Sequence, residues 1–327
     1  MPALSYLVSV FYAAALVLGS PLIKAGQHDK PFAQDVAYQN LNARGGSIDT
    51  IFNAGAASKK PFYAIAHRVN DMDALLLALN DGANAIEMDL FAEITGWWAS
   101  HDGPSKNGDT ARDMFNAVAR HRKGGKPITF VWLDIKNPDR CDPDDQTWRF
   151  CSIAALQDLV REILEPQGVR VLFGFYHTEN GNAYRLIRDD LNSKEAINVD
   201  GRAAPLLEEF TVNGPADVRK RVLSYGDPNI GYLFGNCSEP GDAHLTCTQL
   251  RQAAASGAFG KTFGWTAAAG QTQYVEALLR VGVDGVIYGL GGADYDGSAA
   301  QAAKEIRNSL GKYSDRYYLA GKDDNPW

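Results

Sequence analysis

Short apolar runs rich in β-branched and aromatic residues alternate with amphipathic stretches along the chain after residue 60. The amphipathic stretches, such as DMDALLLALNDG and QTQYVEALLRVG, repeat their apolar residues at the spacing of a helix. The apolar runs are short and are separated by turn-forming residues, which is typical of buried strands. The predicted strands are 62–66, 85–90, 97–100, 128–136, 170–176, 196–199, 230–234, 261–265 and 284–289.

The alternation of strands and helices predicts parallel strand pairing through βαβ units, and hence an α/β fold. About eight such strands in roughly 260 residues indicate a closed (β/α)8 TIM barrel, which we expect to form a single domain over residues 61–327. An open, doubly wound sheet is the alternative that the same pattern allows. The segment 21–60 is polar and lacks a clear period, so we expect it to be a lead-in to the barrel.

The N-terminus contains an apolar stretch, 4–18, that ends at the small residues Gly19 and Ser20. Its length suits the core of a signal peptide better than a full membrane span, which needs about 20 residues. No basic residue lies between Met1 and the stretch, so a signal anchor or a buried helix stays open as an alternative. We expect a signal peptide at residues 1–20 and a secreted protein.

The four cysteines form two evenly spaced pairs. Cys141 and Cys151 are ten residues apart, as are Cys237 and Cys247, and each pair brackets a polar segment. In an oxidising compartment this spacing predicts two local disulfides, although three pairings are formally possible and four separate buried thiols are the alternative. The absence of a Cys-x-x-Cys motif argues against a zinc site.

Composition and charge narrow the class of ligand. At 327 residues and 45% hydrophobic content, the chain can bury a large core. Its net charge of -7 and its pI near 5.4 argue against charge-driven binding of nucleic acid or anionic lipid. We therefore expect a neutral or zwitterionic substrate, and the sequence indicates no stable protein partner.

Polar residues close several of the predicted strands, and in a TIM barrel the chemistry lies at the carboxyl ends of the strands. Because these ends meet at one face of the barrel, we expect their side chains to share one site. The strand-end residues are His67 and Arg68, Glu87 and Asp89, His101 and Asp102, Asp134 and Lys136, and Trp265.

Three of these residues are candidate metal ligands. Side chains two apart on a strand point to the same face, so Glu87 and Asp89 project together toward the barrel axis, with Asp134 on another strand. Three confined carboxylates repel one another unless they share a proton or a cation. Oxygen ligands of this kind suit a hard cation, most simply Mg²⁺. The alternative is a structural ion-pair cluster in which Lys136 and Arg68 neutralise the acids.

The two strand-end histidines favour the catalytic interpretation. A single histidine at such a position is more often a hydrogen-bonded core residue. His67 and His101, however, flank the acidic strand and can face one pocket. Because imidazole can accept or donate a proton near neutral pH, the pair can serve as base or nucleophile and as acid around one phosphorus atom. A cation would hold the phosphate oxygens between them.

Several motifs resemble a known family. The stretches AHRVND, AIEMDLF, SHDGP and VWLDIKNPD resemble the phosphodiesterase barrel superfamily that contains the glycerophosphodiester phosphodiesterases. Within it, FGWTAAAGQTQYVEALLRVGVDGVI and the C-terminal LAGKDDNPW are similar to the sphingomyelinase D/phospholipase D toxins of recluse-spider venom and their fungal homologues. The resemblance covers residues 61–327. It implies a TIM barrel whose C-terminal DNPW tail closes the bottom.

The resemblance also implies roles for individual residues. His67 and His101 match the catalytic histidines, and Lys136 and Trp265 match residues that border the phosphate and the headgroup. The implied reaction releases choline from sphingomyelin or lysophospholipid at a membrane surface, with the lipid's own hydroxyl as nucleophile and a cyclic phosphate as product. The implied Mg²⁺ ligands are Glu87, Asp89 and Asp134.

This chain departs from the venom enzymes at three points. The loop after His101 lacks the cysteine that they carry there. Ala268 stands where an acid is usual, three residues beyond Trp265, and Gly289 stands where an asparagine is usual. We expect both of these positions in the headgroup pocket. Two alternatives therefore stay open: a glycerophosphodiester phosphodiesterase acting on water-soluble diesters, and an inactive lipid-binding barrel.

Overall fold

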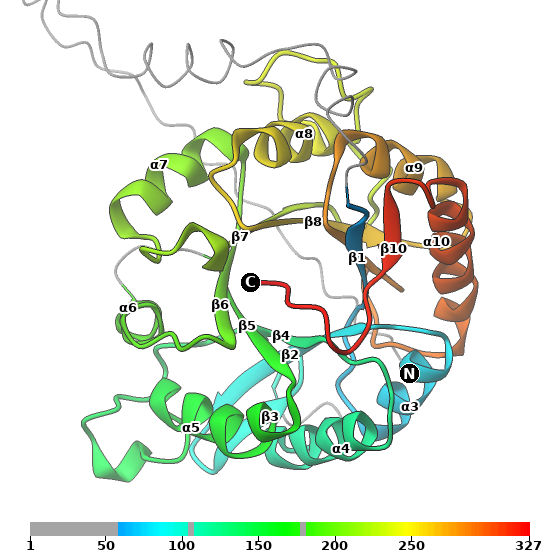
Figure 1. The fold of residues 1–327 in the computed structure, drawn as a ribbon. Coiled ribbons are helices and arrows are strands. Elements are labelled where there is room, and N and C mark those ends of the chain that lie inside the picture. Colours follow the sequence, from blue (N-terminus) through cyan, green and yellow to red (C-terminus); the bar gives the residue numbers. More distant parts are fainter. Residues whose placement is uncertain (1–57, 104–107, 177–180) are drawn as a thin grey trace, which may run out of the picture. The chain divides into compact units, whose positions relative to one another are not determined.

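The computed structural model describes residues 58–103, 108–176 and 181–327. The predicted signal peptide at 1–20 and most of the predicted lead-in, up to residue 57, lie outside these residues. In the described part of the chain, eight parallel strands close into a barrel surrounded by helices (Figure 1), which confirms the predicted (β/α)8 fold. The barrel closes because β1 pairs with both β2 and β9.

The barrel strands and the outer helices alternate in the chain. The eight barrel strands are β1 (Lys60–Ala66), β2 (Ala85–Glu93), β4 (Phe130–Ile135), β5 (Arg170–Phe175), β6 (Glu195–Asp200), β7 (Arg221–Gly226), β8 (Lys261–Ala267) and β9 (Gly285–Tyr288). The helices are α3 (Met72–Asn80), α4 (Ala111–Lys123), α5 (Ile153–Ile163), α6 (Asn182–Asp189), α7 (Ala203–Asn213), α8 (Thr246–Ser256), α9 (Thr272–Val281) and α10 (Ala300–Lys312). None of these helices is long and apolar enough to cross a bilayer.

Two of the predicted strands differ in the structure. The run predicted at 97–100 is β3 (Gly96–Ala99), which pairs antiparallel with β2 and forms a hairpin outside the barrel. The strand predicted at 230–234 is wrong, because Leu233 has a left-handed backbone with φ +48° and only part of the run is buried. The barrel strand is instead β7, whose sequence RVLSYG is too polar to stand out but pairs with β6 and β8.

Two apolar cores lie on either side of the barrel wall. Side chains of β2 illustrate the division, because Ile86, Met88 and Leu90 belong to the core between strands and helices. Ala85 belongs to the core inside the barrel, which also contains Phe130 and Phe263. The alternation of strand side chains therefore sends every second residue of a strand toward the barrel interior, where the site lies.

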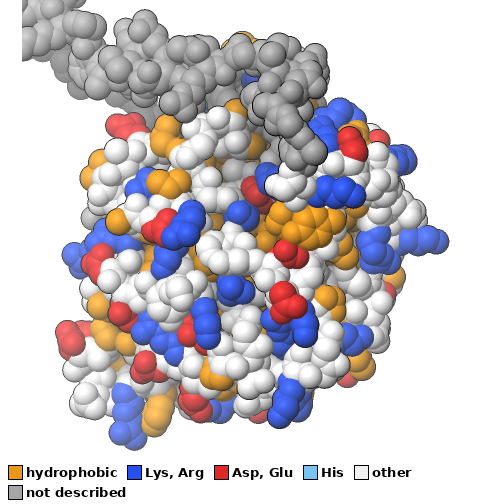
Figure 2. Space-filling view, viewed as in Figure 1, with side chains coloured by type: hydrophobic (Ala, Val, Ile, Leu, Met, Phe, Trp, Pro, Cys, Tyr) orange, Lys and Arg blue, Asp and Glu red, His pale blue; other side chains and the backbone are white. Residues whose placement is uncertain are grey.

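The C-terminal tail enters the barrel at the amino ends of its strands (Figure 1). A short strand, β10 (Tyr317–Leu319), pairs with β1 and directs the tail inward. Trp327 packs inside the barrel with its ring 5.2 Å from that of Phe130 and only 7% of its surface exposed. On the same face, basic and acidic side chains are interspersed (Figure 2).

Replacing Trp327 with alanine is expected to destabilise the fold by about 3 to 5 kcal/mol, because the change leaves a cavity in the inner core. Urea denaturation followed by tryptophan fluorescence and circular dichroism measures the effect. Tyr232→Ala serves as the control, since that ring is 61% exposed and its loss should change the midpoint little. An unchanged urea midpoint for the Trp327 variant would contradict this role of the tail.

Both predicted disulfides are confirmed. Cys141 is bonded to Cys151, and Cys237 is bonded to Cys247. The first closes the loop between β4 and α5, and the second ties the loop after β7 to α8. Both loops lie at the carboxyl ends of the barrel strands.

Candidate functional site

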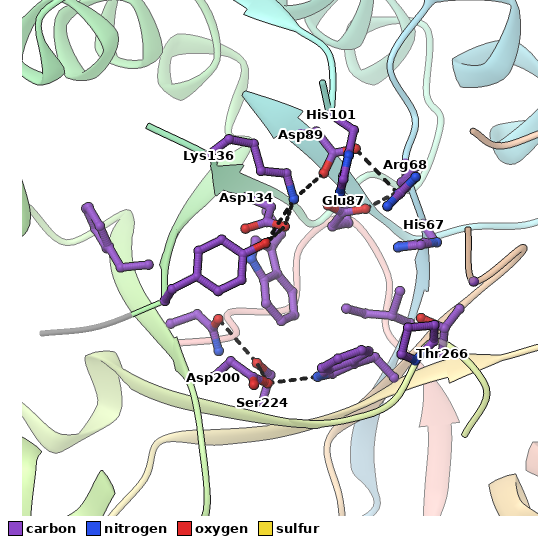
Figure 3. Close-up of a pocket in the computed structure, with 18 residues that line it drawn as sticks. His67, Arg68, Glu87, Asp89, His101, Asp134, Lys136, Asp200, Ser224 and Thr266 are labelled. Carbon is purple, nitrogen blue, oxygen red and sulfur yellow. Dashed lines mark hydrogen bonds and ion pairs between the residues drawn. The ribbon is translucent and has the colours of Figure 1, made fainter. Parts of the chain in front are cut away.

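One cavity at the carboxyl ends of the barrel strands brings the predicted site residues together (Figure 3). The seven candidates come from β1, the β2–β3 hairpin, β4 and β8, or from the residue or two that follow these strands. The lining candidates are His67, Glu87, Asp89, His101, Asp134, Lys136 and Trp265. The barrel fold brings these seven side chains together. Their roles in catalysis, metal binding and substrate binding stay predictions.

The three predicted acidic ligands form a compact, largely buried cluster. Each of Glu87, Asp89 and Asp134 offers a carboxylate oxygen that lies within 4.8 Å of the other two. Glu87 and Asp89 are almost fully buried, at 3% and 1% exposed. They share the inner face of β2, as the alternation predicts, and Asp89 is paired in register with Asp134 on β4.

Two cationic side chains neutralise part of this charge. The Nζ atom of Lys136 lies 2.7 Å from Oδ1 of Asp89 and also bonds to Asp134. The Nε atom of Arg68 lies 3.8 Å from Oδ2 of Asp89. Burial alone would lower the pKa of Lys136, but the surrounding carboxylates outweigh it and raise that pKa above its usual value.

The cluster therefore retains an excess of negative charge, with three carboxylates against two cations. Burial, followed by repulsion from Asp89 and Asp134, raises the pKa of Glu87 well above its usual value. Burial also raises the pKa of Asp134. A proton or a metal ion would relieve this repulsion, and hard carboxylate oxygens at this spacing fit a hard divalent cation. The residues present are thus able to hold a metal ion.

The cluster is held in place by a buried asparagine that follows β1. The Asn70 side chain, 1% exposed, accepts a hydrogen bond from the backbone N–H of Asp89 at 3.0 Å. Its Nδ2 donates to Oδ2 of Asp89 and to Oδ1 of Asp294, both at 2.9 Å. Asn70 thereby fixes the orientation of the Asp89 carboxylate.

His67 is held by the backbone in one tautomer. Its Nδ1 lies 2.7 Å from the carbonyl oxygen of Leu290. Because a carbonyl oxygen can only accept, Nδ1 carries the proton and Nε2 keeps a free lone pair. Burial lowers the pKa of His67 to about 4, although the Leu290 carbonyl opposes the shift. The ring is therefore neutral near pH 7 and can act as a base or nucleophile.

His101 has a different partner. Its Nδ1 lies 2.8 Å from Oδ1 of Asp102, so the carboxylate accepts a hydrogen bond from the ring. The Asp102 carboxylate therefore fixes the orientation of the His101 ring and directs its Nε2 away from itself. The two histidines thus differ in electrostatic surroundings: a neutral carbonyl faces His67, whereas an acidic group faces His101.

The far side of the cavity contains residues that the sequence analysis missed. Trp265 donates from Nε1 to Oδ1 of Asp200 at 2.8 Å, and the Ser224 hydroxyl donates to the same oxygen at 3.0 Å. Burial raises the pKa of Asp200 to about 6 in spite of these bonds. Asp200 is the last residue of β6, so the strand-end rule would have found it if the strand had been extended by one residue.

Tyr176 was also missed. It follows β5 and lines the same cavity. The Nζ atom of Lys136 lies 3.1 Å from its hydroxyl, which in turn lies 3.4 Å from Oδ2 of Asp134. Half of its surface is exposed, so the ring extends from the acidic cluster toward the mouth.

The structure corrects the expected positions of two departures from the family pattern. Neither Ala268 nor Gly289 lines the cavity. Ala268 follows β8 and its backbone N–H donates to Gln271, so the chain has already turned outward there. Gly289 has φ +145°, and a Cβ atom there would lie 3.3 Å from that of His67. This glycine therefore lies directly against His67.

Comparison with known proteins shows which family this chain belongs to. The family described as Sphingomyelinase D/Phospholipase D matches residues 57–327. The chain is 42% identical over 280 residues to the Sphingomyelinase D of Uncinocarpus reesii, covering 82% of this chain and 78% of that protein. It is 38% identical over 337 residues to the Sphingomyelinase D of Arthroderma benhamiae, covering 100% of this chain and 93% of that protein.

A more distant relative is the Dermonecrotic toxin LiSicTox-betaIA1ii of Loxosceles intermedia. It is 25% identical over 304 residues, which cover 83% of this chain and 91% of the toxin. The family match covers the whole barrel, including every predicted site residue. The chain is a phosphodiesterase of the phospholipase D type and belongs to the sphingomyelinase D/phospholipase D family.

Proposed function

We propose that this protein is secreted and removes the choline headgroup from sphingomyelin and lysophospholipids in a Mg²⁺-dependent reaction. The observation that carries the proposal is a single cavity that combines two histidines, an acidic cluster and a wall made of Trp265 and Asp200. The printed names of the fungal relatives support the substrate class. The two disulfides and the N-terminal apolar stretch support export.

The different surroundings of the two histidines support different roles for them in this proposal. His67 is the base, because its ring is neutral and its Nε2 lone pair is free. It removes the proton of the lipid hydroxyl, whose oxygen then forms a bond to phosphorus while the bond to the choline oxygen breaks. His101, whose Nδ1 is bonded to Asp102, donates a proton to the departing choline oxygen. The products are choline and a cyclic phosphate, with no water consumed.

Other residues bind and orient the diester. Trp265 and Asp200 form a wall that suits a quaternary ammonium, through the face of the indole and the nearby carboxylate. Lys136 is available to the phosphate at the opposite side. Mg²⁺ held by Glu87, Asp89 and Asp134 would supply positive charge to the phosphate oxygens. The buried position of the cluster excludes bulk water from the reacting atoms.

The decisive experiment is incubation of purified protein with sphingomyelin, lysophosphatidylcholine or glycerophosphocholine, with Mg²⁺ or with EDTA, followed by phosphorus NMR. We expect cyclic phosphate products from the two lipids with Mg²⁺ and little product with EDTA. Turnover of glycerophosphocholine without turnover of sphingomyelin would favour the water-soluble diesterase instead. No turnover of any substrate would favour a lipid-binding barrel.

Replacing Asn70 with alanine is expected to weaken metal binding by about 10- to 100-fold, because the Asp89 carboxylate loses the groups that orient it. Titration with Mn²⁺ followed by electron paramagnetic resonance measures this affinity without any need for turnover. A merely structural role for Asn70 would lower the melting temperature but leave the affinity at the parent value.

Asn84 provides a matched control for this variant. It is also a fully buried asparagine, but its side chain bonds to the backbone of Ala64, Phe62 and Ala320, away from the acidic cluster. Asn84→Ala should therefore lower the melting temperature and leave the Mn²⁺ affinity unchanged.

A further inference from the structure

Two loops beside the cavity form one cross-linked unit, here called the mouth ledge. It consists of the β2–β3 turn, residues 93–96, and the loop 137–152 between β4 and α5. Each part is continuous with the site, since β3 leads to His101 and the second loop begins directly after Lys136. Both parts of the ledge follow the carboxyl ends of barrel strands, so the ledge lies on the same side of the barrel as the cavity.

Several interactions make the ledge rigid. Asn137 accepts from the N–H of Ala92 at 2.7 Å and donates to its carbonyl at 3.0 Å. The indole of Trp97 donates to the carbonyl of Ser152 at 3.0 Å, and the Cys141–Cys151 disulfide closes the loop. Arg140 forms an ion pair with Glu93 at 3.4 Å. The two loops therefore move together and hold their tips in a defined orientation.

The tips of this rigid unit carry large apolar side chains that face solvent. Ile94 is 54% exposed and Phe150 is 58% exposed. A Cβ atom at Gly96 would lie 3.7 Å from the Phe150 carbonyl oxygen, so the two tips are neighbours. Single exposed apolar residues are common on protein surfaces. Two adjacent ones at the tips of a rigid pair of loops beside a cavity are typical of a surface that binds a partner or a membrane.

The charge of the ledge restricts its partner. The loop 137–152 contains four aspartates against two arginines, and the whole chain has a net charge of -7. One of the arginines, Arg149, stacks over the Phe150 ring at 4.5 Å. An anionic surface would be repelled, whereas a zwitterionic lipid surface offers an apolar layer with no net charge.

We propose that the mouth ledge inserts Ile94 and Phe150 into the surface of a zwitterionic lipid bilayer and so positions the cavity over lipid headgroups. This inference rests on the proposed function, because it assumes that the substrate is presented in a bilayer. Half-exposed Tyr176 lines the cavity, and its hydroxyl lies 3.1 Å from Nζ of Lys136, the residue that directly precedes the ledge loop. Shallow insertion of a few apolar side chains is a general mode of interfacial binding.

The test compares Ile94→Ser/Phe150→Ser with the parent and with Val212→Ser. Val212 is 77% exposed at the end of α7, on the side of the barrel opposite the mouth. The control therefore also replaces an exposed apolar side chain with serine, but at a position away from the ledge. Vesicles of phosphatidylcholine serve as the binding probe, because this lipid has no free hydroxyl for the proposed reaction. Co-sedimentation measures the bound fraction, with and without added phosphatidylserine.

We expect the double variant to bind the vesicles about tenfold more weakly or worse, because two apolar side chains no longer leave water. Its turnover of sphingomyelin in vesicles should fall in parallel, while turnover of a short-chain lysophosphatidylcholine below its micelle concentration stays at the parent rate. Val212→Ser should match the parent in all assays, and phosphatidylserine should not increase binding.

Three results would overturn the ledge proposal: no binding of the parent to phosphatidylcholine vesicles, equal binding of the double variant, or binding that depends on phosphatidylserine. The last would point to an anionic membrane. Vesicle binding that depends on the ledge, without turnover of either lipid, would instead reject the proposed function and retain the ledge. The two proposals therefore fail separately.

Discussion

Replacing His67 with alanine is expected to lower kcat/KM on sphingomyelin by about a thousandfold or more, because the proposed base that accepts the hydroxyl proton is removed. The same loss is expected for His101→Ala, which removes the proposed acid. Both variants should still bind lipid vesicles, since neither residue belongs to the mouth ledge. Release of choline, followed by a coupled colorimetric assay, measures the rate.

His121→Ala is the control for these variants. His121 lies in the last turn of α4 and does not line the cavity, so its loss should leave the rate unchanged. The pH profile separates the two roles. Burial lowers the pKa of His67 to about 4, so its base form persists through neutral pH and is lost only in acid. Turnover at the parent rate by either the His67 or the His101 variant would reject the mechanism.

Asp89→Asn is expected to abolish the stabilisation that Mg²⁺ gives to the protein and to reduce activity by about a thousandfold, because a central ligand becomes a neutral amide. The cluster has three carboxylates and two cations, so this change makes it electrically balanced in the absence of metal. A purely structural ion-pair cluster predicts that the variant melts at a lower temperature, because Lys136 and Arg68 lose the carboxylate between them, with no Mg²⁺ effect in either protein. Melting temperatures measured with and without Mg²⁺ distinguish the two interpretations.

Glu195→Gln is the matched control for this prediction. Glu195 is fully buried and forms an ion pair with Arg161 at 2.8 Å, but it lies at the start of β6, away from the cavity. Its loss should lower the melting temperature and preserve the increase caused by Mg²⁺. If the parent protein shows no Mg²⁺-dependent increase at all, the cluster does not bind this metal.

The positions of most site residues could be predicted from the sequence, because the active site of a TIM barrel lies at the carboxyl ends of its strands. Strand ends can be recognised locally, and all strand ends of a parallel barrel meet at one face. This sufficed for Glu87 and Asp89, which share one face of β2 by alternation, and for Asp134, which lies near the end of the neighbouring strand β4. It failed for Asp200, since the local pattern placed the strand end one residue too early. It failed also for β7, where arginine, serine and glycine interrupt the apolar residues of a short run.

The pairing of β3 also could not be predicted from the local sequence. Its short aromatic run predicts a strand, but the direction of pairing depends on the turn and on the partner strand. As a result the hairpin extends outward from β2 and brings His101 back over the acidic cluster. The mouth ledge likewise arises from contacts between segments more than 40 residues apart, such as Ala92 with Asn137, which no local pattern encodes.

The sequence by itself predicted the fold class, the two local disulfides and most of the side chains at the strand ends, because each of these depends on periodicity or on spacing along the chain. Only the tertiary structure decided the tautomer of His67, the charge imbalance of the acidic cluster, the carboxylate beside Trp265 and the ledge at the mouth. These features depend on distances between distant segments and on burial, and both appear only when the barrel closes and removes water from its interior.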